Sequence, residues 1–226
     1  MKTLIIAAHP DDEVLGCGGT IARLAASGDD VHIVIAGDGI TSRYEHPENA
    51  DSSLVQSLHA TSKQVGTILG AKSVTLLRFP DNRFDTAPLL ELVKKLEALI
   101  DELRPEAVYT QHGGDLNIDH QLVFRASLTA TRPMAEASVK RLYAYPVGSS
   151  TEWAFDQFAP TFKPNSFVDI SSFLETKLAA MGLYESECRP APHPRSREVL
   201  RATAAHWGSA VGLAAAEPFA LIREIR

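Results

Sequence analysis

Residues 3–13 read TLIIAAHPDDE, an apolar run followed at once by one imidazole and three carboxyl groups. The apolar part, residues 3–8, has the composition of a buried strand, and the polar part begins where that strand would end. In open α/β sheets, ligands bind beyond the carboxyl ends of the strands. Packing several carboxylates there is costly unless a cation neutralises them. The segment therefore predicts a metal site after a first strand, with one carboxylate left over to act as a base.

The overall composition is that of a globular protein. The chain has 226 residues, of which 45% are hydrophobic and 22% are charged, and we expect a single domain over residues 1–226. A net charge of −6 argues against a general nucleic-acid binder, and two cysteines suggest no disulfide framework. Residues 1–2 lead directly into the first strand, and no apolar run approaches the ~20 residues that span a bilayer. We therefore expect a cytoplasmic protein without a membrane span, and a homo-oligomer.

Strand-like and helix-like patterns alternate through the first two thirds of the chain. The predicted strands are residues 3–8, 31–36, 73–77, 107–110 and 141–145. The predicted helices are residues 16–27, 54–69, 89–103 and 121–131. This alternation predicts βαβ units, and hence an α/β Rossmann-like three-layer sandwich with a mostly parallel sheet. The C-terminal part adds a strand, two helices and a final edge strand, at residues 166–170, 172–186, 195–205 and 219–225.

A second loop rich in possible metal ligands follows the fourth predicted strand. Residues 111–120 read QHGGDLNIDH, and this loop should lie on the same rim as the loops after the first and second strands. His9, Asp12 and His120 together offer two imidazoles and one carboxylate, a set that suits a catalytic zinc with a position left for water. Asp11 could take the proton, and Asp119 could orient a histidine. The same ligands accept other divalent ions, such as Fe²⁺.

Each half of this proposed site has a plainer interpretation. An Asp-Asp pair after a strand often serves only as a helix N-cap, and a lone histidine at a helix start needs no ligand role. The presence of both loops in one chain, at the ends of predicted strands, favours the metal.

The first loop also resembles a known family signature. Residues 8–13, AHPDDE, with Gly16 and the pair Gly18–Gly19, are similar to the signature of the PIG-L/LmbE-like family of zinc-dependent deacetylases. The pair Asp119–His120 is similar to the second motif of that family, and the resemblance covers roughly residues 1–145.

This resemblance implies a fold, a cofactor and a reaction. It implies a Rossmann-like fold in which zinc is held by His9, Asp12 and His120, with Asp11 as general base. It further implies hydrolysis of an acetamido group to an amine and acetate. The implied partner is a small N-acetylated sugar of the N-acetylglucosamine type, carried on a nucleotide, a lipid, a glycan or an antibiotic precursor.

The chain departs from the family pattern at Asn117. Many relatives have a histidine there, and that histidine is a usual candidate for oxyanion stabilisation or acid catalysis. Asparagine can donate a hydrogen bond but cannot supply a proton. His193, which lies between two prolines, is our first candidate for the acid, and His112 is the second. The alternative for His193 is an ordinary loop histidine.

Further polar residues near the predicted rim are candidate substrate contacts, and His112 and Asn117 of the second loop are among them. Asp81 and Arg83 follow the third strand, where Asp81 could bind sugar hydroxyls and Arg83 could clamp an anionic group. Arg43 follows the second strand and is a second candidate for an anion. A turn at residues 80–82 and solvated loop arginines are the simpler alternatives. Arg195 stands at a predicted helix start, where a cation is unfavourable, which leaves room for another role.

Other functions remain open on the same scaffold. The glycines at 16, 18 and 19 fail the dinucleotide fingerprint, because Ile21 occupies the third glycine position, and we expect them to let the helix pack close to the sheet. An amidase for a different amide conjugate is one alternative. A sugar- or nucleotide-binding module without catalysis is another alternative. The intact set of metal ligands argues against it.

Overall fold

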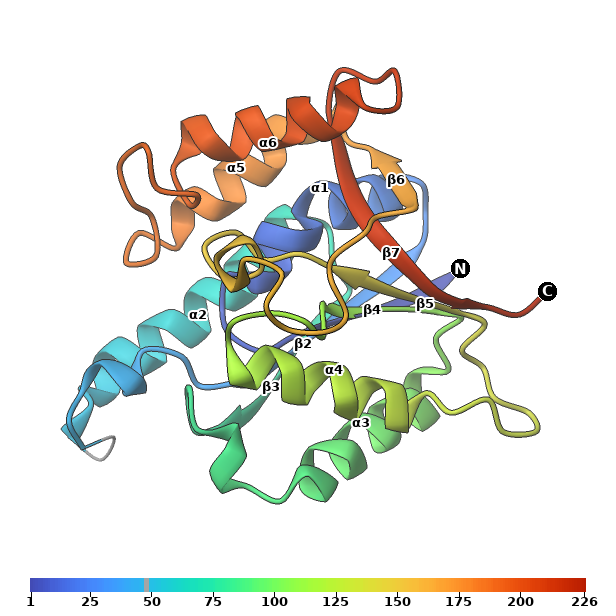
Figure 1. The fold of residues 1–226 in the computed structure, drawn as a ribbon. Helices are drawn as coiled ribbons and strands as arrows, with labels where there is room; N and C mark the ends of the chain where they lie inside the picture. The colour runs from blue at the N-terminus through green and yellow to red at the C-terminus, as the bar shows by residue number, and fades with distance from the viewer. Residues whose placement is uncertain (47–48) are drawn as a thin grey trace.

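The computed structural model describes residues 1–46 and 49–226, whose strands form one seven-stranded sheet (Figure 1). The sheet order is β3-β2-β1-β4-β5-β7-β6. The strand bounds are β1 Lys2–Ala7, β2 Asp30–Gly37, β3 Ser73–Phe79, β4 Ala107–Gln111, β5 Arg141–Tyr145, β6 Ser166–Asp169 and β7 Ala216–Glu224. Strands β1 to β5 pair in parallel, whereas β7 runs antiparallel to β5 and to β6. The predicted α/β class with a mostly parallel sheet is confirmed.

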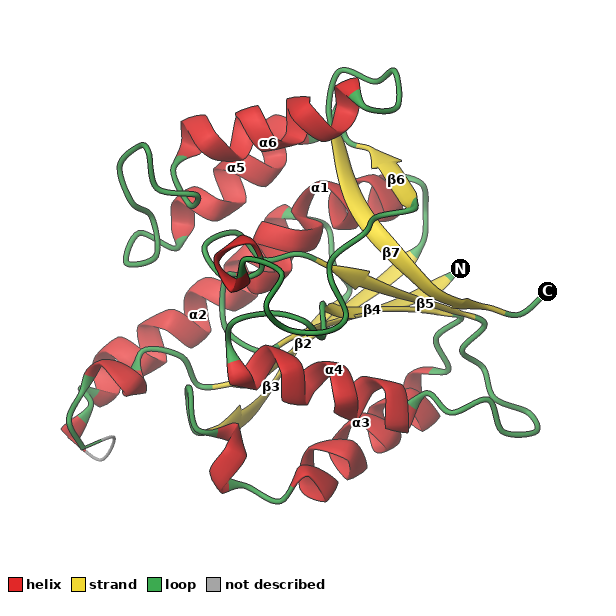
Figure 2. Cartoon of the chain, viewed as in Figure 1, coloured by secondary structure: helices red, strands yellow, loops and turns green. Residues whose placement is uncertain are grey.

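Helices cover both faces of the sheet (Figure 2). The helices on one face are α1 Asp12–Ala26, α2 Ser52–Ile68, α5 Leu174–Leu183 and α6 Arg197–Ser209. The helices on the other face are α3 Leu89–Leu103 and α4 Ile118–Ala130. Alternate residues of β1 serve the two layers, because Ile5 and Ala7 join the first core while Leu4 and Ile6 join the second. Burial on both faces explains why the first strand is a continuous apolar run.

The glycines of α1 allow that helix to lie close to its neighbours. A side chain at Gly16 would overlap the ring of Tyr145 in β5, and a β-carbon at Gly19 would lie 2.6 Å from Ile170. The expected close packing is therefore confirmed. The Tyr145 hydroxyl also donates a hydrogen bond to the Ile6 carbonyl at 2.7 Å, which ties β5 to β1 beneath the first loop.

The final strand differs from its prediction as an edge strand. Strand β7 lies between β5 and β6, so β6 takes the edge and the predicted placement is wrong. The reason is that β6 pairs only with Ala216 to Phe219, and residues 220–224 pair with β5 alone. The exposed pattern of those later residues therefore resembles that of an edge strand.

The strand order places a crevice beside β1. This strand pairs with β2 on one side and with β4 on the other, because the chain builds β2 and β3 outward and then returns to form β4. Such a reversal is the topological switch point at which open α/β sheets bind ligands. The loops after β1 and β4 therefore face each other across this crevice. Within the described part of the chain, no helix combines the length and apolarity needed to cross a bilayer.

Candidate metal centre

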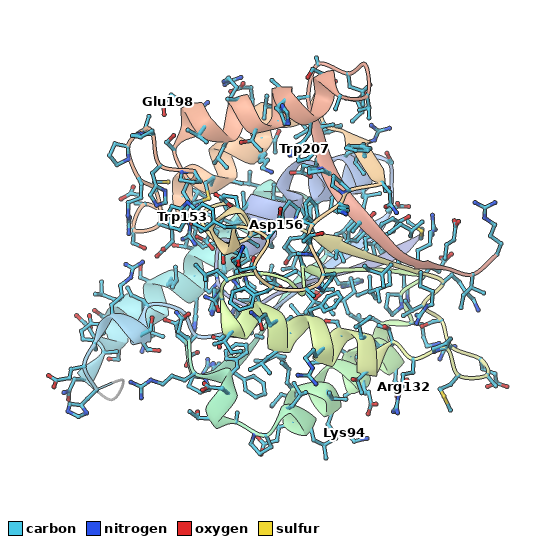
Figure 3. All side chains as sticks on the ribbon, viewed as in Figure 1. Lys94, Arg132, Trp153, Asp156, Glu198 and Trp207 are labelled. Atoms are coloured by element: carbon cyan, nitrogen blue, oxygen red, sulfur yellow. The ribbon has the colours of Figure 1, made fainter. Side chains whose placement is uncertain are left out.

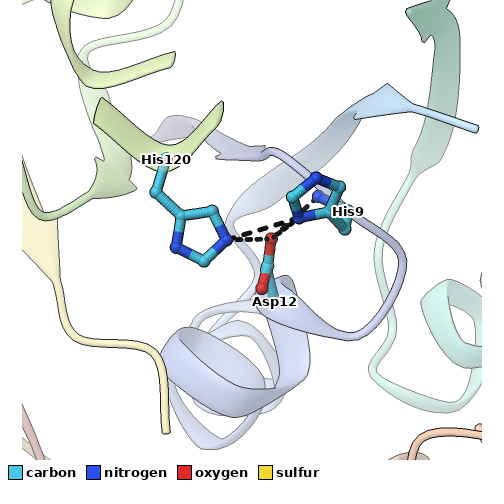
Figure 4. Close-up of side chains that lie close together, drawn as sticks. All are labelled: His9, Asp12 and His120. Atoms are coloured by element: carbon cyan, nitrogen blue, oxygen red, sulfur yellow. Dashed lines mark hydrogen bonds and ion pairs between the residues drawn. The ribbon is translucent and has the colours of Figure 1, made fainter. Parts of the chain in front are cut away.

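Three ligand-type side chains converge at the switch point. His9 follows β1, Asp12 begins α1, and His120 lies in the first turn of α4 (Figure 4). His9 Nδ1 lies 3.4 Å from Asp12 Oδ2, and His120 Nε2 lies 3.3 Å from the same oxygen. The two imidazole nitrogens are themselves 3.3 Å apart. Asp12 and His120 are buried, and His9 is partly exposed.

This triangle fits a tetrahedral divalent ion. Ligands at ~2.0–2.1 Å from a tetrahedral centre lie about 3.3–3.4 Å from one another, by the geometry of zinc sites. The three separations match that value. In addition, Asp12 Oδ1 is buried and has no hydrogen-bond partner among the described residues. Two nitrogen donors and one oxygen donor suit zinc or Fe²⁺, so the residues present fit a metal ion.

Carboxylates orient both histidine rings from behind. His9 Nε2 donates to Asp119 Oδ2 at 2.9 Å, which leaves Nδ1 facing Asp12. His120 Nδ1 lies 3.1 Å from Asp115 Oδ1, which leaves Nε2 facing the same point. A carboxylate behind a ligating imidazole is the usual way to set its tautomer. Asp119 thus lies where the sequence placed it, whereas Asp115 was not predicted.

Asp12 is fixed by two donors of its own. The backbone N–H of His9 donates to Asp12 Oδ2 at 2.8 Å, and Gln111 Nε2 donates to the same oxygen at 3.0 Å. Gln111 is the last residue of β4, so a strand rather than a loop supports this contact. The sequence signal for Gln111 was its position at the start of the ligand-rich loop.

The charges of the three residues depend on one another. Burial would raise the pKa of Asp12, but His120 and His9 hold it well below its usual range. Burial would lower the pKa of His120, but Asp12 and Asp115 raise it to about 9. Burial would likewise lower the pKa of His9, but Asp119 and Asp12 raise it well above its usual range. Without an ion, protonated imidazoles therefore neutralise these carboxylates, and a metal ion would replace those protons.

Asp11 is held beside the triangle in an unusual backbone conformation. Its φ is 109°, and its N–H donates to Glu13 Oε2 at 3.1 Å. Glu13 is held in turn by the Tyr184 hydroxyl, which donates to Oε1 at 2.7 Å, and burial raises the pKa of Glu13 to about 7. A strained residue of this kind costs about 1–3 kcal/mol and persists only where its surroundings hold it. Asp11 lines the pocket that His9 and His120 also line.

Arg195 contacts the Asp11 carboxylate from the far end of the chain. Its Nη1 lies 2.7 Å from Asp11 Oδ2 and 3.3 Å from Glu187 Oε2, and its Nε donates to Ser149 Oγ at 2.9 Å. Burial raises the pKa of Asp11 well above its usual range, and Arg195 opposes that effect. The unfavourable cation at a helix start was the sequence signal for a further role of Arg195. No comparable signal marked Glu187.

A pocket of about 170 Å³ opens over the metal triangle. It brings together three of the predicted substrate contacts: Arg43, Asp81 and Asn117. Arg43 pairs with Glu187 at 2.6 Å, and Asp81 Oδ2 accepts hydrogen bonds from Ser42. Asn117 caps α4 by accepting the Asp119 N–H, and its Nδ2 donates to Asn82.

The remaining candidates for acid catalysis and substrate contact, Arg83, His112 and His193, are not among the described residues that line this pocket. Arg83 is exposed at the start of the short helix η3, Phe84–Thr86. His112 is buried and donates from Nε2 to the Pro160 carbonyl at 2.7 Å. His193 accepts the Arg195 N–H at its Nδ1 and stands edge-on to Trp153. This contact is with the Arg195 backbone, so among the described residues His193 neighbours the pocket without lining it.

Two solved structures match the fold almost end to end. An N,N'-diacetylchitobiose deacetylase from Pyrococcus horikoshii matches with a TM-score of 0.77, at 23% identity over 98% of this chain and 84% of that one. The 4-carboxy-2-hydroxymuconate hydratase GalB from Pseudomonas putida matches with the same TM-score of 0.77, at 21% identity over 100% and 98%. At these identities the likeness establishes the fold alone, and the fold carries two different reactions.

Sequence relatives identify the family. An uncharacterized deacetylase of Escherichia coli, YaiS, is 30% identical over 81% of this chain and 90% of its own length. A 1D-myo-inositol 2-acetamido-2-deoxy-alpha-D-glucopyranoside deacetylase of Mycobacteroides abscessus is 32% identical over 84% of this chain and 68% of its own. The family model described as PIG-L, GlcNAc-PI de-N-acetylase, matches residues 4–131. The chain belongs to the PIG-L family.

Proposed function

We propose that the protein is a metal-dependent hydrolase that removes the N-acetyl group from an N-acetylglucosamine-type amino sugar. The observation that carries the proposal is the donor triangle of His9, Asp12 and His120, with its 3.3–3.4 Å edges, next to the carboxyl of Asp11. Membership of the PIG-L family and the deacetylases among the relatives support the same reaction. Zinc is the proposed ion, and Fe²⁺ is the alternative that the same donors accept.

Asp11 is the proposed general base. An ion bound by the triangle would polarise the acetamide carbonyl and lower the pKa of a water molecule. Asp11 lines the same pocket, where it would accept the proton as water attacks the carbonyl carbon. The Arg195 guanidinium fixes the orientation of that carboxylate and favours its ionised form.

The groups that would stabilise the oxyanion and protonate the leaving amine differ from the usual family pattern. Asn117 Nδ2 is the proposed donor to the developing oxyanion, because Asn117 lines the pocket at the position of the usual histidine. It cannot protonate the amine. His193 remains our predicted acid; its Nδ1 accepts the backbone N–H of Arg195, so Nε2 would carry the proton.

The pocket suggests how the sugar is held. We propose that Asp81 binds sugar hydroxyls and that Arg43 meets an anionic group, which would have to compete with Glu187 for the guanidinium. Substrate contacts of Arg83 and His112 stay predictions without support from the pocket lining. The single domain over residues 1–226, the cytoplasmic location and the homo-oligomeric state also stay predictions.

Metal analysis combined with an acetate assay tests this function. The purified protein, loaded with zinc or Fe²⁺, is incubated with N-acetylglucosamine in free, nucleotide-linked, glycan-linked and lipid-linked forms. We expect one bound ion per chain and release of acetate from at least one of these sugars. Direct measurement of acetate matters, because a hydratase on the same fold would add water without releasing a fragment. A metal-loaded protein that binds the sugars and releases no acetate would be a binding module instead.

A further inference from the structure

Two arginines that line the metal pocket share one carboxylate. Arg43 Nη2 donates to both oxygens of Glu187, at 2.6 and 2.7 Å, and Arg195 Nη1 lies 3.3 Å from Glu187 Oε2. All three side chains belong to residues that line the pocket over the metal triangle. Glu187 therefore already holds the guanidinium group that an anionic part of a substrate would need at Arg43.

Glu187 is held in place from its own side of the pocket. It lies in a turn after α5, where its backbone N–H donates to the Tyr184 carbonyl at 2.8 Å and the Ser186 hydroxyl donates to its Oε1 at 2.9 Å. The side chain of Glu187 is 11% exposed, whereas that of Arg43 is 42% exposed. The carboxylate is thus the more buried partner of the pair, and the guanidinium group is the one that solvent and a ligand can reach.

Arg195 is fixed to the proposed base. Its Nη1 lies 2.7 Å from Asp11 Oδ2, and its backbone N–H donates to His193 Nδ1 at 3.1 Å. The His193 ring stands edge-on to Trp153, which Figure 3 labels on the neighbouring segment. Arg195 is thereby committed to the Asp11 carboxylate, and Arg43 is the guanidinium group that a substrate can take over.

Arg43 lies beside the proposed sugar contact. The preceding residue, Ser42, donates to Asp81 Oδ2 from its backbone N–H at 3.0 Å and from its hydroxyl at 2.6 Å. The short helix η1, Thr41–Arg43, is thereby tied to the loop after β3, and Asp81 lines the same pocket as Arg43. A group attached to a sugar that Asp81 holds would therefore meet the pair of Arg43 and Glu187.

Among the described residues that line this pocket, carboxylates outnumber guanidinium groups. The carboxylates are Asp11, Asp81 and Glu187, and the guanidinium groups are Arg43 and Arg195, each of which has a carboxylate partner. An anion that binds Arg43 must displace Glu187 and leave that carboxylate, largely buried, without this cation. The lost pair and the repulsion between like charges both oppose the anion, whereas an uncharged group meets neither cost.

We propose that Glu187 is a specificity-determining residue, which disfavours substrates with a negative charge at Arg43 relative to uncharged ones. The proposal rests on the proposed deacetylase function and narrows the carrier of its sugar. Glu187 acts by occupying Arg43, without touching the reacting atoms. An uncharged carrier would thus gain over a phosphate-linked one, and loss of the Glu187 charge should free Arg43 for an anion.

The test compares N-acetylglucosamine with its 1-phosphate and its 6-phosphate. Glu187→Gln keeps the size of the side chain and removes its charge. It should raise the ratio of kcat/KM for a phosphate to kcat/KM for the uncharged sugar by at least about tenfold, or about 1.4 kcal/mol, for at least one phosphate. The gain should disappear in the double variant Arg43→Gln/Glu187→Gln, because the freed guanidinium group is then missing. The matched control is Glu185→Gln, which removes the same charge at an exposed residue outside the pocket and should leave the ratio unchanged.

A binding measurement separates failure of this proposal from failure of the deacetylase function. Calorimetric titration of the metal-free protein with inorganic phosphate should show binding that Glu187→Gln tightens about tenfold and that the double variant does not tighten. Such a gain without acetate release from any of the sugars would support selection by Glu187 and count against the deacetylase. Acetate release at a ratio that Glu187→Gln leaves unchanged would overturn the role of Glu187. A gain that persists without Arg43, or that Glu185→Gln reproduces, would overturn it too.

Discussion

Two clusters of buried charge flank helix α1, and they are built in opposite ways. Along the helix, Lys177 and Glu217 form a 2.6 Å pair, and Glu217 also accepts from the backbone of Gly19 and Thr20. At the start of the helix, two imidazole nitrogens face each other at 3.3 Å, and Asp12 Oδ1 has no partner among the described residues. The first cluster satisfies itself and is structural. The second leaves its donors directed at a common point, which indicates a binding site.

Removal of a triangle carboxylate should have the largest effect. We expect Asp12→Ala to lower metal affinity by more than about 100-fold and to abolish acetate release. This loss of affinity exceeds the range expected when only a residue that supports a ligand is removed. Asp115→Asn, which changes only the carboxylate behind His120, should cost about 10- to 100-fold in affinity. Metal titration monitored by calorimetry gives both values. Equal affinity of Asp12→Ala and wild type would remove Asp12 from the site.

Neutralising the proposed base should separate chemistry from metal binding. Asp11→Asn should retain the ion but lower kcat by about 10²–10⁴, the usual range for loss of a general base. The control is Asp101→Asn on the exposed side of α3, which should behave as wild type. Steady-state acetate release and metal content are measured on the same preparations. Unchanged turnover of Asp11→Asn would exclude it as the base.

Breaking the buried ion pair of Lys177 and Glu217 should affect stability instead of metal binding. Lys177→Met leaves Glu217 buried without its cation, so we expect a loss of about 3–5 kcal/mol in the free energy of unfolding. Lys94→Met, at an exposed pair with Glu97 in α3, should cost at most about 1 kcal/mol. Urea unfolding of the metal-free variants measures both. A loss below about 1 kcal/mol for Lys177→Met would show that the buried pair contributes little.

The titration of the triangle predicts that metal affinity rises with pH. Neighbouring carboxylates raise the pKa of His120 to about 9 and that of His9 well above its usual range, so the ion must displace protons from these two imidazoles. The apparent dissociation constant should therefore fall about tenfold per pH unit for each proton released, until the pH passes about 9. Calorimetry in buffers of different ionisation heat counts these protons. An affinity that stays constant between pH 6 and 8 would contradict the assigned donors.

The smallest expected effect concerns His193. His193→Ala should reduce turnover without loss of the ion, because His193 is the proposed acid and is not one of the metal donors. The matched control is His206→Ala, at the exposed end of α6. Wild-type kinetics of His193→Ala would make His193 a structural loop residue and leave the amine to be protonated by solvent.

The metal triangle was largely predictable because its residues lie in short motifs at strand ends. An apolar run followed by HPDDE, and a fourth strand followed by a ligand-rich loop, are local patterns. Parallel strands then bring both loops to one rim. Asp119 was also predicted as an orienting carboxylate, whereas Asp115, in the same loop, was not. The difference between these two depends on ring orientation, which the spacing of residues does not encode.

The sequence alone determined the alternating strands and helices, the parallel sheet and the donors of the candidate metal site, because periodicity and loop composition act over short stretches of chain. Only the tertiary structure decided that β7 lies inside the sheet, that Arg195 holds Asp11 across 184 residues, and that Glu187 pairs with Arg43 across 144 residues. These features arise where separate elements pack against one another. Their contacts depend on the shape and charge of partners that are remote in the chain.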